Sequence, residues 1–160
     1  RFMSQTDKRL EQLGIELPKK DRRGKGVVAV RQCGDLLFVS GHGPTDQTTP
    51  EDTPVYTGKL GADLSVEQGY QAARLCGINL LAAIRDYLGD LDRIEYLVKA
   101  FGLVASSPEF FDQPAVMHGF SDLMVEVLGE RGQHARSAMG TCCLPRNIPV
   151  EVELVAKIRT

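Results

Sequence analysis

Hydrophobic positions recur at helical spacing in three segments of the 160-residue chain. The strongest pattern follows Ser65-Val66-Glu67-Gln68, a capping-box sequence in which Ser and the third residue after it satisfy backbone N–H groups of the first turn. Its apolar stripe runs to about Leu88, and Gly89 supplies a stop signal. A second helix is predicted over residues 113–128, and a short amphipathic helix over residues 4–14.

Alternating or continuous apolar runs predict the strands. We expect strands at residues 27–30, 36–40, 58–60, 94–105, 136–144 and 150–158. Both alternating faces of the 94–105 run are largely apolar, so both are expected to be buried. Helices of one small domain cover one face of a sheet, and a neighbouring subunit is a natural cover for the other. The element order predicts an α+β fold with two helices on one face of the sheet.

The remaining segments define the domain organisation. Residues 42–57 contain three prolines among polar residues and predict a long loop, which is typical of a lid or a site wall. Residues 1–26 are interpreted as an N-terminal extension and residues 27–160 as a single domain. The basic run at residues 19–25 is typical of a solvated connector rather than a binding patch.

Composition narrows the function classes. The net charge of −2 and the pI of about 5.9 argue against a dedicated nucleic-acid binder, which needs a basic face to neutralise phosphates. No apolar run approaches the roughly 20 residues that span a bilayer, so no membrane association and a cytoplasmic location are expected. Four cysteines, at Cys33, Cys76, Cys142 and Cys143, lack paired metal spacing and are expected to be small buried thiols. The last two should point to opposite faces of one strand.

Candidate chemistry lies in the last quarter of the chain. Arg136 opens one predicted strand and Glu151 lies near the start of the next, with a Leu-Pro-Arg-Asn turn between them. An arginine fork is well shaped to hold a carboxylate by two parallel hydrogen bonds. Glu151 either pairs with Arg136 as a strand-end salt bridge or positions and deprotonates a water molecule. The three dispersed histidines predict no metal site, and His134 is expected on a turn without a chemical role.

Several motifs in the same order resemble the Rid family, also called YjgF-like or endoribonuclease L-PSP-like. They are Gly34-Asp35-Leu36-Leu37-Phe38-Val39-Ser40-Gly41, Gly69-Tyr70-Gln71-Ala72-Ala73-Arg74, Leu88-Gly89-Asp90-Leu91-Asp92-Arg93 and the region from Arg136 to Glu153. The resemblance covers residues 27–158. It implies a chorismate-mutase-like α+β fold assembled as a homotrimer, with ligand sites in the clefts between subunits. It also implies hydrolysis of reactive enamines and imines to 2-keto acids and ammonia, without a metal or cofactor.

The resemblance assigns roles residue by residue. Arg136 would bind the substrate carboxylate, and Glu151, the catalytic candidate, would position the attacking water. Ser40 and Gly41 would line the pocket together with the backbone near Ala138. Because an imine carbon is already electrophilic, orientation of substrate and water would supply most of the acceleration.

Some positions depart from the family pattern. Val27 stands where deaminating relatives carry a tyrosine, and Ala138 stands where some carry a cysteine. The asparagine of the second helix is replaced by His118 or Gly119. His118 is therefore a candidate substitute in the pocket, and His42, which follows the Ser40-Gly41 segment, is a candidate lining residue.

Three function classes follow. The first is a small-carboxylate-binding homotrimer that hydrolyses enamines or imines, and the second is a non-catalytic metabolite-binding or regulatory trimer that keeps the same clamp. The third, RNA cleavage or translation inhibition, is disfavoured by the acidic balance and by the lack of an aromatic and basic surface. The N-terminal extension and the loop at residues 42–57 suggest a longer-chain subgroup of the family.

Overall fold

A computed structural model describes residues 2–19 and 26–160, so most of the basic run predicted as a connector lies outside the described residues. The main sheet has five strands in the order β1-β2-β7-β5-β6. Their bounds are Val30–Cys33 (β1), Leu36–His42 (β2), Val150–Ile158 (β7), Ile94–Ala105 (β5) and Ala135–Thr141 (β6). β5 and β6 are parallel, and the other neighbours are antiparallel. The mixed sheet confirms the predicted α+β class.

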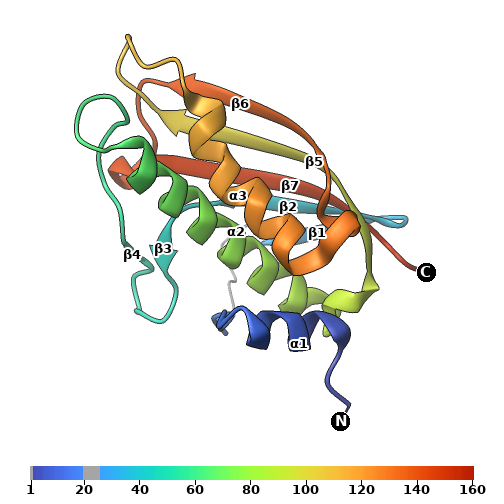
Figure 1. Cartoon of the computed structure of the whole chain (residues 1–160). Coiled ribbons are helices and arrows are strands. Elements are labelled where there is room, and N and C mark those ends of the chain that lie inside the picture. The colour runs from blue at the N-terminus through green and yellow to red at the C-terminus, as the bar shows by residue number, and fades with distance from the viewer. Residues whose placement is uncertain (1, 20–25) are drawn as a thin grey trace.

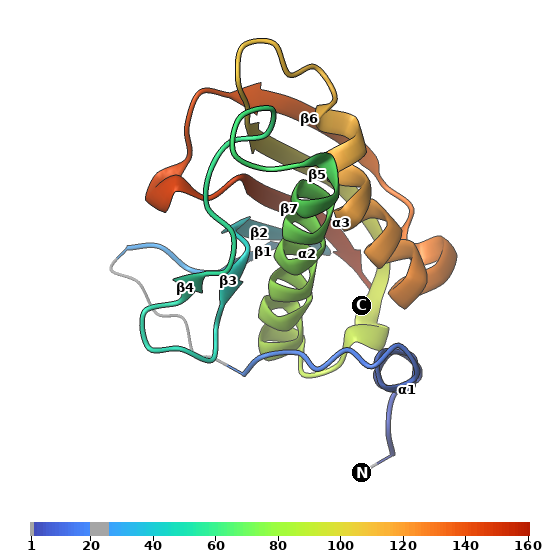
Figure 2. The same cartoon turned by 60° about the vertical axis from the view of Figure 1, so that its left-hand side comes forward.

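Two long helices, α2 (Val66–Leu88) and α3 (Gln113–Leu128), lie side by side across one face of the sheet (Figures 1 and 2). Both predicted helices are therefore confirmed. The Ser65 hydroxyl and the Gln68 side chain form the expected capping box, and Gly89 ends α2 in the left-handed conformation. Within the described residues no helix covers the opposite face, which we call the open face. None of the described helices is long and apolar enough to cross a membrane.

β5 differs from the predicted strict alternation. Its register with β7 shifts between Leu97 and Lys99, so Leu97 and Ala100 both face the helices although they are three residues apart. Beyond the shift, Lys99, Phe101 and Leu103 point to the open face, where they are half-buried in the single chain. The sequence predicts that a neighbouring subunit of a trimer covers this face, and that stays a prediction.

The region between β6 and β7 also differs from the prediction. The two strands are not neighbours, because β5 lies between them. β6 ends at Thr141, so Cys142 and Cys143 follow the strand and are both exposed, as is Cys33. Only Cys76, on α2, is buried. The prediction that the cysteines are buried is therefore wrong for three of the four. Cys142 and Cys143 lie beyond the end of β6, and Cys33 lies at the end of β1, an edge strand of the sheet.

The loop at residues 42–57 contains a small hairpin of its own. Thr45–Asp46 (β3) pairs with Thr53–Pro54 (β4) in a separate two-stranded sheet. Asn79 of α2 is buried beneath the loop at residues 42–57, and its Nδ2 donates to the carbonyl oxygens of Gly43 and Thr45 at 3.0 Å each. These two hydrogen bonds attach the loop to α2.

The N-terminal helix α1 (Gln5–Gln12) is anchored to the body of the domain. The Asp92 carboxylate, just before β5, accepts hydrogen bonds from the backbone N–H groups of Gln5 and Thr6 at 2.8 and 2.9 Å. An anion at a helix N-terminus is favourable because the first N–H groups have no partner within the helix. Leu10 and Leu17, 3% and 4% exposed, belong to the same hydrophobic core as the sheet and the long helices.

Candidate functional site

Arg136 lies on β6, the edge strand, and faces the helix layer. Its register partner on β5 is Ala100, a fully buried core residue, so both side chains lie on the same side of the sheet. There Nη1 of Arg136 donates to Nδ1 of His118 and to Oγ of Ser121, both on α3 and both at 3.1 Å. His118, the predicted substitute for the family's asparagine, thus contacts the predicted carboxylate anchor.

The rest of the Arg136 guanidinium is available. Among residues 2–19 and 26–160, no hydrogen bond engages its Nε or Nη2. These two nitrogens form one edge of the fork, which matches the two oxygens of a carboxylate. Partial burial lowers the pKa of Arg136 and the nearby Asp122 carboxylate opposes this effect, so the group stays a cation. The arrangement can hold a small planar anion.

A serine and a histidine complete this cluster. Ser121 Oγ lies 2.9 Å from Nε2 of His134, and Nδ1 of His134 lies 2.7 Å from the carbonyl oxygen of Gly132. The His134 ring also packs edge-to-face against Phe120, with 5.3 Å between ring centroids. Neither Ser121 nor a role for His134 was predicted from the sequence, because the contact joins the middle of a helix to a turn 13 residues later.

Glu151 lies on the open face. Its register partner on β5 is Leu103, and its side chain packs beside Gly41 of β2, where a Cβ atom would lie 3.0 Å from Glu151 Cδ. Burial raises the pKa of Glu151, and the Glu153 carboxylate on the same face raises it further. A carboxyl group with a raised pKa is suited to exchange protons with a water molecule.

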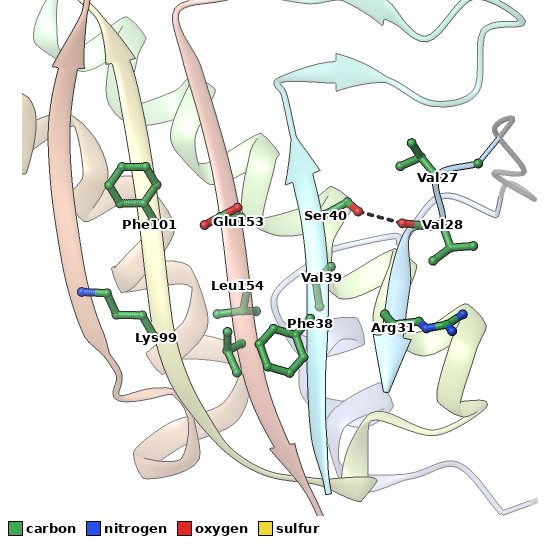
Figure 3. A pocket seen from close by; sticks show the side chains of 12 residues that line it. Val27, Val28, Arg31, Phe38, Val39, Ser40, Lys99, Phe101, Glu153 and Leu154 are labelled. Atoms are coloured by element: carbon green, nitrogen blue, oxygen red, sulfur yellow. Dashed lines mark hydrogen bonds between the residues drawn. The ribbon is translucent and has the colours of Figure 1, made fainter. Parts of the chain in front are cut away.

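A hollow of about 390 Å³ lies beside Glu153 on the open face (Figure 3). We call it the open-face hollow. It is lined by Gly26, Val27, Val28, Arg31, Phe38, Val39, Ser40, Lys99, Phe101, Glu153, Leu154 and Val155. Val27 and Ser40 therefore line the same hollow. Ser40 Oγ donates to the carbonyl oxygen of Val28 at 2.7 Å, which fixes the hydroxyl at the rim. Lys99 and Arg31 stand at opposite sides of the hollow, with Glu153 between them.

Two further candidates lie on the helix-covered side of the sheet. Ala138 is paired with Gly102 of β5 and shares the face of Arg136. His42 is 3% exposed and is paired with the core residue Val152, and its Nδ1 donates to the carbonyl oxygen of Ser40 at 2.6 Å. Its ring is thus placed in the interior, away from the open-face hollow.

The predicted site residues therefore form two groups in one chain. Arg136, His118 and Ala138 lie on the helix side of the edge strand, whereas Ser40, Gly41 and Glu151 lie at the open face or its rim. β5 separates the strands of Arg136 and Glu151, and the two side chains point to opposite faces. The strand-end salt bridge that the sequence left as an alternative does not fit this placement. In the described part of the chain, no cluster of His, Cys, Asp or Glu could hold a metal ion.

Comparison with known proteins identifies the fold and the family. The family model described as "YjgF/chorismate mutase-like, putative endoribonuclease" matches residues 7–158. Protein TCP17 of Trypanosoma cruzi is 39% identical over 150 residues, which cover 93% of this chain and 91% of that protein. A protein of unknown function from Agrobacterium tumefaciens has a crystal structure with a TM-score of 0.87, at 38% identity over 97% of this chain and 92% of its own.

A second crystal structure, of a "putative endoribonuclease" from Shewanella oneidensis, has a TM-score of 0.89 at 30% identity and covers 97% of this chain and 100% of its own. The match of the family model to nearly the whole chain agrees with the motifs of β2, α2 and the β6–β7 region. The resemblance drawn from those motifs is thereby confirmed. The chain belongs to the YjgF/chorismate mutase-like family, which is the Rid family of the sequence analysis.

Proposed function

We propose that the protein binds small carboxylates through Arg136 and hydrolyses 2-imino acids, and their enamine tautomers, to 2-keto acids and ammonia. The observation that carries the proposal is the state of Arg136. One of its nitrogens, Nη1, is fixed by His118 and Ser121, while the Nε and Nη2 edge remains for a ligand. An arginine that holds the carboxylate also fixes the position of the carbon atom bonded to it. In a 2-imino acid this atom is the carbon of the C=N bond.

The reaction needs a water molecule and two proton transfers. Water adds to the imine carbon, and the C–N bond then breaks as the nitrogen takes up protons and leaves as ammonia. The raised pKa of Glu151 suits it to take a proton from the water and to return one to the nitrogen. An enamine first takes a proton on carbon and loses one from nitrogen, which converts it to the imine. Orientation supplies most of the acceleration, because the imine carbon is already electrophilic.

The complete site forms, in this proposal, between two copies of the chain in a homotrimer. Arg136 is on an edge strand, while Glu151 and the open-face hollow are on the face that no described helix covers. Phe38 on this face is 47% exposed and Met139 53% exposed in the single chain. An apolar face of this kind favours association, and a neighbouring edge strand would bring Arg136 over the hollow.

Two other functions are candidates for this site. The Shewanella oneidensis protein is described as a "putative endoribonuclease", which makes RNA cleavage a second candidate. The net charge of −2 does not favour an RNA-binding surface. The third candidate is a trimer that binds carboxylates without catalysis, favoured by Val27 in place of the family's tyrosine. Incubation with single-stranded RNA and coupling to an amino-acid oxidase that releases 2-imino acids distinguish the three.

Calorimetric titration with 2-ketobutyrate and with benzoate tests the anchor. We expect Arg136→Ala to abolish binding and Arg136→Lys to restore little of it, because an ammonium group cannot reproduce the fork. Arg159→Ala, which removes an exposed guanidinium near the C-terminus, is the matched control and should bind as the unchanged protein does. Undiminished affinity in a folded Arg136→Ala variant would show that the anchor lies elsewhere.

A mixing experiment tests whether the site is shared. Arg136→Ala and Glu151→Gln are each expected to be inactive alone. If each site takes Arg136 from one subunit and Glu151 from the next, random mixed trimers regain about one quarter of the sites, because each site then needs one particular pair of neighbours. If the co-expressed variants recover no imine hydrolysis, the proposal that each site takes Arg136 from one subunit and Glu151 from the next is wrong.

A further inference from the structure

We infer that Ser121 and His134 are positioning residues that hold Arg136 through a one-directional chain of hydrogen bonds, an inference that rests on the proposed function of Arg136. The chain runs from Arg136 through Ser121 and His134 to the carbonyl oxygen of Gly132. We call it the Arg136 relay. It joins β6, α3 and the turn before β6.

The donor at each step follows from the chemistry of the groups. A carbonyl oxygen only accepts, so Nδ1 of His134 carries a proton and donates it to Gly132. Burial lowers the pKa of His134, and the Arg136 cation lowers it further, so the ring is neutral at pH 7. Its Nε2 then has a lone pair, which accepts the hydroxyl proton of Ser121 at 2.9 Å.

The same reasoning fixes the other end of the relay. A guanidinium only donates, so the oxygen of Ser121 accepts from Nη1 of Arg136. The second proton of Nη1 goes to Nδ1 of His118, which must therefore be unprotonated. The neutral ring of His118 carries its proton on Nε2. The two histidines thus have opposite tautomers. The Gly132 carbonyl oxygen determines that of His134, and the Arg136 guanidinium determines that of His118.

The relay determines which edge of Arg136 meets a ligand. Both protons of Nη1 are used, one by Ser121 and one by His118. The Nε and Nη2 edge is left pointing away from these two partners, since the guanidinium is planar. Because Arg136 carries several rotatable bonds, fixing one nitrogen at two points lowers the entropy that binding would otherwise cost. A planar monocarboxylate is the ligand that this single free edge fits.

The placement of His134 supports a positioning role. Its ring packs against Phe120 and donates to the carbonyl oxygen of Gly132, and these two contacts aim Nε2 at Ser121. Ser121 and His134 reach the ligand only through Arg136, whose charge is the group that contacts the anion. A serine nucleophile activated by His134 is the rival role, since the same contact is found in serine hydrolases.

Two measurements test the relay. Long-range proton–nitrogen NMR of the unchanged protein should show His134 with its proton on Nδ1 and His118 with its proton on Nε2. The opposite tautomer at either ring, or a protonated His134 ring at pH 7, would overturn the relay whatever the protein binds. These spectra are independent of any ligand.

The second measurement is calorimetric titration with 2-ketobutyrate. Ser121→Ala should weaken binding by roughly tenfold or more, as expected for a lost hydrogen bond to a charged group. Ser121→Thr keeps the hydroxyl and should bind within about threefold of the unchanged protein. The control is Thr48→Ala, which removes an exposed hydroxyl of the β3–β4 hairpin that contacts Asp46 and should leave affinity unchanged.

The outcomes separate the two proposals. If the unchanged protein binds no carboxylate, the proposed function fails, while the NMR spectra still decide the relay. If it binds and Ser121→Ala binds equally well, the positioning role is overturned. Covalent labelling of Ser121 by a fluorophosphonate would overturn it as well, because the serine would then be a nucleophile.

Discussion

Gly41 of β2 and Glu151 of β7 approach so closely that a methyl group on Gly41 would lie 3.0 Å from the carboxyl carbon. Contacts this short require one partner to move, and the Glu151 side chain is the movable one. We expect Gly41→Ala to displace the carboxylate and to lower imine hydrolysis, while Arg136, on the other face, keeps its affinity for 2-ketobutyrate. The rate of imine loss and the calorimetric affinity are measured on the same variant. Unchanged turnover would remove Glu151 from the reaction.

Glu151→Gln separates catalysis from structure at this position. The amide keeps the size of the side chain and loses the charge that activates water. Imine hydrolysis should fall by about 10²–10⁴-fold, the range for removal of a general base, while carboxylate affinity is kept. In the double variant with Gly41→Ala the two losses should not add, since both act on the same carboxylate. Additive losses would show that Gly41 acts on something else.

The raised pKa of Glu151 gives stability a defined dependence on pH. A carboxyl group whose folded pKa exceeds its unfolded value binds more protons in the folded state. Its contribution is therefore fully present below the unfolded value, near 4.5, and is lost as the pH rises through the folded value. Relative to Glu151→Gln, the unchanged protein should lose melting temperature as the pH is raised from 4 to about 8. A constant difference across this range contradicts the raised pKa.

Packing of the two long helices depends on Gly119. A Cβ atom there would overlap the carbonyl oxygen of Tyr70 on α2, a backbone atom that cannot rotate away. We expect Gly119→Ala to lower the free energy of unfolding by about 1–3 kcal/mol or more. The exposed Val125 lies on the same helix, and Val125→Ala should change stability by only about 0.5 kcal/mol or less. Urea unfolding of both variants gives the comparison.

The thiols should fall into two reactivity classes. Cys33, Cys142 and Cys143 are exposed, whereas Cys76 is buried and burial raises the pKa of its thiol. Because the thiolate is the reactive form, a disulfide reagent should modify three thiols quickly and the fourth only in denaturant. Cys76→Ala should remove the slow class alone. Four fast thiols in the folded protein would mean that α2 is not packed as described.

The sequence predicted the elements that local signals determine. The Ser65-Gln68 capping box, the apolar stripe of α2 and the glycine after each long helix are contained in short windows, and both helices are confirmed. β7 is confirmed with its predicted bounds, Val150–Ile158. The small β3–β4 hairpin was missed because two-residue strands have no periodicity to detect.

The arrangement of the site depended on non-local pairing that the sequence could not supply. The insertion of β5 between β6 and β7 places Arg136 and Glu151 on opposite faces, although only 14 residues separate them along the chain. The register shift at Leu97–Lys99 also depends on the partner strand. Ser121 and His134 meet only after α3 has packed on the sheet, so no spacing rule would have paired them.

The anchoring of α1 has a practical consequence for anyone who wishes to produce this domain in isolation. A fragment beginning at residue 27, the boundary suggested by the family motifs, would lack Leu10 and Leu17, which fill the core beneath the long helices. The carboxylate of Asp92 would lose the hydrogen bonds that it accepts from the backbone N–H groups of Gln5 and Thr6. Such a fragment would present bare apolar surface to water and would aggregate. Residues 2–19 thus supply part of the hydrophobic core on which the stability of the domain depends.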